Sequence, residues 1–195
     1  MVKIIVEGDG DRNLIEELLK HLAKNEQIPK YNFQSLIIHM GGKKKLLNGN
    51  DTKYIKILTP EVRNDKIKKA LFLFDCDFEE DDQKCNGMDN SKKCFEKLLE
   101  KLKWDIPVDY HIFDRNLDYF LIETIKDKEC YEHFDNLIEC LEVERIKPNK
   151  KPIAKLYKDL YPYPKFDFED QRFEPLKTKL TNLFEKETDD NITSN

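Results

Sequence analysis

The sequence predicts an α/β fold with a Rossmann-like central parallel sheet of about four strands, flanking helices and a C-terminal α-helical extension. Short apolar runs alternate with helical patterns as far as about residue 116, and beyond it the apolar spacing is helical. All six glycines lie at or before Gly87, whereas five of the eight prolines lie at or after Pro148. The two ends of the chain are therefore expected to be built differently.

The first strand and helix lie at the start of the chain. Residues 2–6 form a short apolar run that ends at Glu7-Gly8. The apolar residues that follow recur at helical spacing, namely Leu14, Ile15, Leu18, Leu19, Leu22 and Ala23. Because this spacing places them on one face, the segment predicts a buried strand followed by an amphipathic helix.

Three further apolar runs predict the remaining strands. Residues 36–38 lead into Gly41-Gly42 and a lysine-rich segment that we expect to be helical. The continuous run 70–74 is typical of a central parallel strand with both faces covered. Residues 108–113 alternate in polarity and are expected nearer an edge, after a helix at about 91–103.

Three segments are expected along the chain: an α/β core at 1–125, a helical extension packed on it at 126–186 and a disordered tail at 187–195. The proline-rich stretch 161–168 is expected to lie on the surface as an extended strap. The extension has three candidate roles, which are covering the sheet, binding substrate and forming an oligomer.

Composition excludes several classes of protein. A net charge of −5 excludes a surface that is basic all over, as in histone-like proteins. The start of the chain resembles neither a signal peptide nor a membrane span. The five cysteines are at least nine residues apart and form no CxxC pair. We therefore expect a cytoplasmic protein in a reducing compartment, with no membrane contact and no zinc ribbon or disulfide framework.

Acidic residues follow two of the predicted strands. Glu7 comes directly after the first strand, and Asp75 and Asp77 come at the end of the third. If these strands are neighbours, the three carboxylates converge at the carboxyl edge of the sheet, where open α/β sheets bind ligands. Such a concentration of negative charge requires either protonation or a cation, and oxygen ligands of this kind suit Mg²⁺ or Mn²⁺.

These residues also form a family pattern. The segment Val6-Glu7-Gly8-x-x-Asp11 before a helix, followed later by an apolar strand ending in Asp75-x-Asp77, resembles the Toprim domain over about residues 2–125. Toprim domains occur in topoisomerases, bacterial primases, recombination mediators, small RNA-maturing nucleases and the OLD family of nucleases.

The resemblance implies a role for each acidic residue. Glu7 would act in acid/base chemistry or as a metal ligand, and Asp75 and Asp77 would hold Mg²⁺ or Mn²⁺. Asp11 matches an acidic position that joins the metal site in the OLD-like branch, and Glu79 completes an Asp-x-Asp-x-Glu run. Two residues also have structural explanations, because Asp11 suits a helix N-terminus and Glu79 suits a solvated acidic loop.

A basic segment follows the second strand. Nine basic residues and three acidic ones lie between Lys43 and Lys69. Gly41, Gly42, Lys43 and Lys44 are expected to bind a phosphate through backbone N–H groups and ammonium groups. The alternative is a solvated basic helix face.

The expected function is divalent-metal-dependent hydrolysis of phosphodiester bonds in DNA or RNA. By analogy with the OLD-like nucleases, a separately encoded ATPase would be a partner. One alternative is a non-catalytic Toprim-fold module that binds nucleic acid or a protein. A haloacid-dehalogenase-like phosphatase also has an Asp-x-Asp strand, but that family has Thr or Val at the position of Glu79 and leaves Glu7-Gly8 unexplained.

Overall fold

Four parallel strands form one sheet in the computed structural model, which describes residues 1–124 and 166–185. The strands are β1 (Val2–Val6), β2 (Ile37–His39), β3 (Lys69–Asp75) and β4 (Val108–Phe113), in the spatial order β2-β1-β3-β4. β1 therefore pairs with β3, and β4 lies at an edge, where the sequence places it. The predicted α/β class with a parallel sheet is confirmed.

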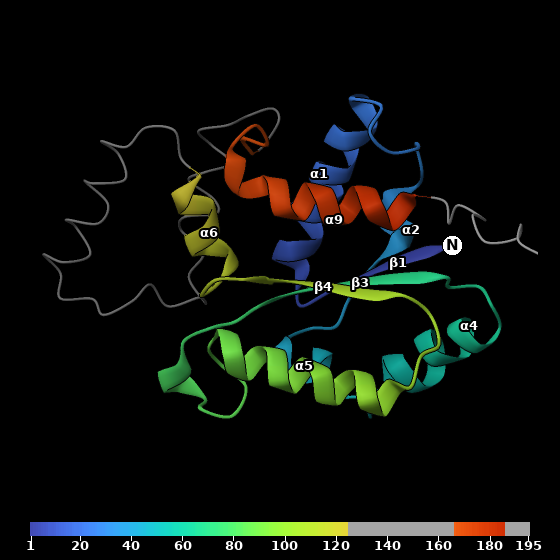
Figure 1. The fold of residues 1–195 in the computed structure, drawn as a ribbon, viewed down its shortest axis with the longest axis vertical. Helices are drawn as coiled ribbons and strands as arrows, with labels where there is room; N and C mark the ends of the chain where they lie inside the picture. Colours follow the sequence, from blue (N-terminus) through green and yellow to red (C-terminus); the bar gives the residue numbers. More distant parts are fainter. Residues whose placement is uncertain (125–165, 186–195) are drawn as a thin grey trace, which may run out of the picture.

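Helices cover both faces of this sheet (Figure 1). One face carries α1 (Asp9–Lys24), α2 (Phe33–Leu36), α6 (Leu117–Glu123) and α9 (Glu174–Phe184), with η4 (Gln171–Phe173) leading into α9. The other face carries α4 (Thr59–Arg63) and α5 (Met88–Leu102). The shorter elements are α3 (Lys43–Leu46), the π-helical turn η1 (Tyr54–Leu58) and the 3-10 turn η2 (Glu79–Asp81).

Alternate residues of β3 serve the two cores. Leu71 and Leu73 belong to the cluster that includes α1 and α9, whereas Phe72 and Phe74 pack with α5. The ring of Phe95 in α5 lies 5.0 Å from that of Phe72 and 5.6 Å from that of Phe74. Both faces of β3 are thus covered, which accounts for its continuous apolar run.

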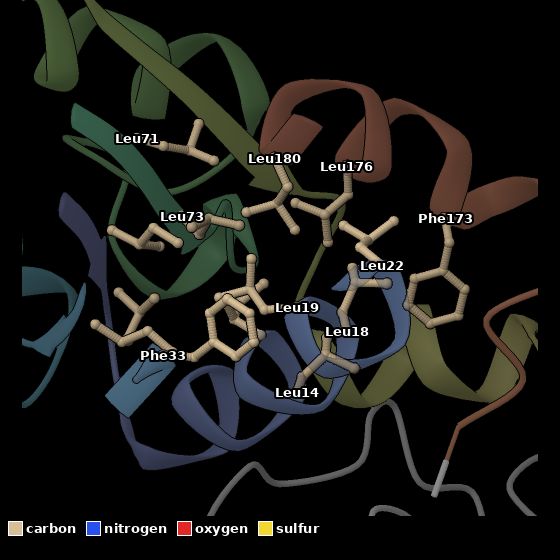
Figure 2. Packing of buried hydrophobic residues seen from close by; sticks show 14 of the residues in the cluster. Leu14, Leu18, Leu19, Leu22, Phe33, Leu71, Leu73, Phe173, Leu176 and Leu180 are labelled. Atoms are coloured by element: carbon tan, nitrogen blue, oxygen red, sulfur yellow. The ribbon is translucent and has the colours of Figure 1, made fainter. Parts of the chain in front are cut away.

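α9 packs on α1 although the two helices lie at opposite ends of the chain. Figure 2 shows Leu176 and Leu180 of α9 together with Leu18 and Leu22 of α1 in one apolar cluster. Each of these four side chains is fully buried. The C-terminal helix therefore completes the core on this face of the sheet.

The aromatic residues before α9 correct one expectation. Phe166 and Phe168, within the stretch expected as a surface strap, are buried in the same cluster as α1 and α9. Their rings lie 5.7 Å apart, and that of Phe168 lies 5.2 Å from that of Phe173. Burial of large apolar rings outweighs the surface placement that the nearby prolines suggest.

The described residues cover the expected core almost to its end at residue 125. Residues 166–185, which include η4 and α9, are the described part of the extension expected at 126–186, while residues 125–165 and the tail expected at 187–195 lie outside the described part. Neither described segment contains a helix whose length and apolar character would let it cross a bilayer.

Replacing Leu180 by alanine tests the packing of α9. The side chain is fully buried, so Leu180→Ala should lower the free energy of unfolding by about 3 kcal/mol through lost burial and a cavity. Urea unfolding followed by circular dichroism measures the change. Thr178→Ala, at an exposed position of the same helix, should change it by less than about 0.5 kcal/mol. Equal stabilities of the two variants would contradict this packing.

Candidate functional site

The pairing of β1 with β3 brings the first two acidic residues together. Val6 is in register with Leu73, so both strands end at the same edge of the sheet. There the backbone N–H of Asp75 donates a hydrogen bond to Oε2 of Glu7 at 3.3 Å. The structure therefore meets the condition that the two strands be neighbours, and it joins Glu7 to Asp75 directly.

Asp11 enters the same group from the first turn of α1. Its Oδ2 accepts a hydrogen bond from the backbone N–H of Gly8 at 2.8 Å, so it caps the helix N-terminus as the structural explanation proposed. The residue is buried, and its negative charge also acts on Glu7 and Asp75. Asp11 thus combines a capping role with membership of the acidic group.

Asp77 has a left-handed backbone, with φ 55°. Its N–H donates to the carbonyl oxygen of Arg115 at 2.6 Å, which ties the loop after β3 to the loop after β4. Its Oδ2 lies 3.3 Å from the ammonium of Lys43. A conformation rare for residues other than glycine is therefore held by contacts from two other loops.

Burial and mutual repulsion raise the proton affinity of this group. Burial, followed by the charges of Asp11 and Asp77, raises the pKa of Glu7 to about 7. Burial, followed by the charges of Asp11, Glu7 and Asp77, holds the pKa of Asp75 well above its usual range. The pKa of Asp77 is also raised by burial, although Lys43 opposes this. Without a cation, the group is partly protonated at neutral pH.

The chemistry of these side chains fits a hard divalent cation. Oδ1 of Asp75 is buried and has no hydrogen-bond partner among the described residues, although burial of a polar oxygen ordinarily requires one. Within residues 1–124 and 166–185, no group of three or more His, Cys, Asp or Glu side chains is arranged so that it could hold a metal ion as it stands. The fit therefore rests on the type of donor and on the unsatisfied oxygen.

Glu79 lies apart from the group. It belongs to η2, and its Oε1 accepts a hydrogen bond from Nδ2 of Asn90 at 3.3 Å. It is exposed, and its charge is absent from the influences that shift the pKa values of Glu7, Asp75 and Asp77. The structure thus brings together four of the five residues predicted as metal ligands.

The two glycines of the predicted phosphate loop use their N–H groups within the protein. The N–H groups of Gly41 and Gly42 both donate to the carbonyl oxygen of Glu7, each at 2.9 Å. Both glycines have positive φ, at 82° and 122°, so this turn depends on the absence of a side chain. Of the four residues predicted to bind phosphate, Lys44 has an exposed side chain.

Lys43 is buried beneath this loop. Its ammonium donates to the carbonyl oxygen of Cys76 at 2.7 Å, to Oδ1 of Asn86 at 3.0 Å and to Oδ2 of Asp77 at 3.3 Å. An ammonium group has three N–H bonds, so these acceptors use its whole donor capacity. Lys43 therefore holds Asp77 in place, a role that the sequence pattern did not indicate.

A pocket of about 670 Å³ opens beside Asp77. Its basic lining comes from the segment after β2 and from the loop after β3, and includes Lys44, Lys45 and Lys84. Asp81 and Asp82 line it as well, so its charge is mixed. The pocket has the size of a small-ligand site and borders the acidic group.

A disulfide corrects the expectation drawn from cysteine spacing. Cys85 and Cys94 form a disulfide with a Cα–Cα distance of 5.8 Å. The bond joins the loop after β3 to α5, because the loop folds back over the first turns of that helix. Sequence spacing did not reveal this approach, and the expectation of no disulfide is wrong for this pair.

The comparisons with known proteins add no relative. No protein-family model matches the sequence, and neither a search of curated proteins nor a search of solved structures found a match. The resemblance to the Toprim domain therefore depends on the motif residues and on their placement in the sheet.

The raised pKa of Glu7 predicts a pH-dependent stability difference. In the folded protein Glu7 retains its proton up to about pH 7, whereas the unfolded chain loses it near pH 4.5, so ionisation disfavours folding between these values. The stability gain of Glu7→Gln over wild type should grow from pH 5 to pH 7 and then level off, at the order of 3 kcal/mol.

Urea unfolding in EDTA at several pH values measures this difference. His111 has a lowered pKa, which makes the free energy of unfolding rise with pH over part of this range. This contribution cancels in the comparison because both proteins contain His111. Glu100→Gln, at an exposed position of α5, should show no such trend. A gain that does not depend on pH would contradict the raised pKa of Glu7.

Loss of the disulfide should lower the free energy of unfolding by about 3 kcal/mol, because the Cys85–Cys94 bond closes a loop with a sequence separation of 9. Unfolding with and without a phosphine reductant measures the change. The double variant Cys85→Ser/Cys94→Ser is the control, since reductant should leave its stability unaltered. A wild type that does not respond to reductant would show that the pair is not oxidised.

Proposed function

We propose that the protein is a divalent-metal-dependent phosphodiesterase that cleaves DNA or RNA. The observation that carries the proposal is the convergence of Glu7, Asp11, Asp75 and Asp77 at the carboxyl edge of a parallel sheet, with raised pKa values for three of them. A protein that buries like charges without a cation loses stability, and sites of this kind are usually functional.

In this proposal Asp75 and Asp77 are the principal ligands of Mg²⁺ or Mn²⁺, and Asp11 supports them. A bound cation of this type would neutralise charge on a phosphodiester and lower the pKa of water. Lys43 fixes Asp77 through the hydrogen bond between them. Asp75 and Asp77 thus share one task, and Asp11 and Lys43 support it.

Glu7 is suited to accept a proton. Burial and the charges of Asp11 and Asp77 raise the pKa of this carboxyl to about 7 without a cation. A bound cation would lower this pKa, so Glu7 would be ionised and able to take a proton at neutral pH. The hydrogen bond from the N–H of Asp75 fixes one carboxylate oxygen of Glu7 and leaves the other to meet a water molecule. Glu7 is therefore the proposed base.

Nucleic acid is the proposed substrate because basic side chains flank the acidic group. Lys44 and Lys45 are exposed on α3, and with Lys84 they line the pocket beside Asp77. Cations at this position suit the phosphates next to the scissile one. A separately encoded ATPase partner and a cytoplasmic location stay predictions from the sequence.

The phosphatase alternative is less compatible with this geometry. A haloacid-dehalogenase-like site would give no role to Glu7 and Asp11, whose charges act on Asp75 in the structure. The metal-dependent phosphodiesterase proposal uses all four carboxylates.

Replacing Asp75 by asparagine tests the proposed function. Asp75→Asn should abolish Mg²⁺- or Mn²⁺-dependent cleavage and weaken cation binding at least tenfold, because it removes the central charge of the group. The variant should still fold and be more stable than wild type in EDTA, since an uncharged side chain relieves the repulsion. Calorimetric metal titration and incubation with plasmid, single-stranded DNA and structured RNA measure these effects.

Asp105→Asn is the matched control, because Asp105 is exposed and precedes β4 at the opposite edge of the sheet. It should bind cations and cleave like wild type. Cleavage by Asp75→Asn at the wild-type rate would refute the assignment. Cation binding without cleavage by wild type would favour the non-catalytic nucleic-acid or protein binding module.

A further inference from the structure

The loop after β4 lies directly beside the loop that carries Asp77. The carbonyl oxygen of Arg115 accepts from the N–H of Asp77 at 2.6 Å, and the N–H of Arg115 donates to Sγ of Cys76 at 3.0 Å. Both Asp77 and Arg115 have φ 55°, in the left-handed region. Two residues in an uncommon conformation are thus joined at the edge of the acidic group, and the backbone of Arg115 is fixed there.

The side chain of Arg115 lies over an aromatic ring at this edge. Its guanidinium carbon is 5.1 Å from the ring centre of Tyr119 in α6. The ring of Tyr119 meets that of Phe78 edge to face at 5.6 Å, and Phe78 directly follows Asp77 in the chain. Arg115 is exposed, and both rings are half-buried. We name Phe78, Arg115 and Tyr119 the aromatic shelf.

The charge of Arg115 is more available to a ligand than that of Lys43. Lys43 is buried and donates to three protein acceptors, as described above. No ion pair of Arg115 occurs within residues 1–124 and 166–185, and its guanidinium is held over a ring instead of beside a carboxylate. Next to the acidic group, Arg115 is therefore the better placed cation for a phosphate of the substrate.

The shelf has the composition of a site for unpaired nucleotides. Aromatic rings and guanidinium planes stack on nucleobases, and arginine also binds the phosphates between them. In a duplex the faces of each base are covered by the neighbouring bases. The rings of the shelf can therefore stack on a base more readily in a single strand. A site for a free phosphate alone would need the cation but not the rings.

We propose that the aromatic shelf binds single-stranded nucleic acid, with Arg115 on a phosphate and Tyr119 and Phe78 against an adjacent base. This inference rests on the proposed function, because it supplies the strand that the acidic group would cleave. Arg115 is a substrate-binding residue in this scheme, and the acidic group is the place of reaction.

Fluorescence anisotropy tests the shelf without relying on cleavage. Fluorescein-labelled dT12, rU12 and a 12-base-pair DNA hairpin are titrated with the full chain in Ca²⁺ at several salt concentrations. Wild type should bind at least one single strand more tightly than the hairpin. Arg115→Gln should weaken single-strand binding at least fivefold and lower the slope of log affinity against log salt by about 1.

Tyr119→Leu should weaken single-strand binding at least fivefold and leave hairpin binding within twofold, because it removes stacking but no charge. The matched controls are Arg63→Gln and Tyr31→Leu, which alter exposed residues away from the acidic group and should bind like wild type. Thermal unfolding verifies that each variant folds. Since Arg115 is exposed, Arg115→Gln keeps the test decisive even if Tyr119→Leu is unstable.

Equal binding by Arg115→Gln and Arg63→Gln would overturn the shelf, as would tighter binding of the hairpin or no binding of any probe by wild type. Hydrolysis by wild type judges the proposed function separately. Cleavage combined with normal binding by Arg115→Gln would refute the shelf alone. Arg115-dependent binding without any cleavage would retain the shelf and refute the catalytic role.

Discussion

The burial of like charges at the carboxyl edge of β1 and β3 is the constraint around which this end of the molecule is built. Parallel pairing places Glu7 against the backbone of Asp75, and the first turn of α1 adds Asp11. Glu7, Asp75 and Asp77 are half-buried, so the repulsion between them is only partly screened and protons are retained. This repulsion is opposed by the buried ammonium of Lys43, which contacts Asp77, and by backbone N–H groups that donate to Glu7 and Asp11.

Contacts between these loops fix the loops relative to one another, in addition to fixing the carboxylates. Lys43 connects the segment after β2 to Asp77 and Asn86 in the loop after β3, and the Cys85–Cys94 disulfide anchors that loop to α5. On the other side, Arg115 connects it to β4. A loop of this length would ordinarily be adaptable, whereas here its geometry is fixed from three directions.

Sequence patterns predicted the fold well because its strands are defined by burial. The run 70–74 became the centre of β3, and the placement of Glu7 and Asp75 followed from parallel strand pairing. Patterns could not show that the Lys43 ammonium turns inward, since a lysine after a glycine turn is equally compatible with solvent. The Cys85–Cys94 approach and the left-handed backbone of Arg115 depend on tertiary contacts that spacing does not encode.

The hydrogen bond between Asp77 and Arg115 has a thermodynamic consequence under the proposed function. It makes one rigid unit of a residue that would hold the cation and a residue that would hold the strand. Because contacts of the protein already order this unit, neither ligand would pay the free energy of ordering it. A cation bound at the carboxylates would instead offset their repulsion of the strand's phosphates, and reciprocity requires that cation and strand raise the affinity for each other by the same factor.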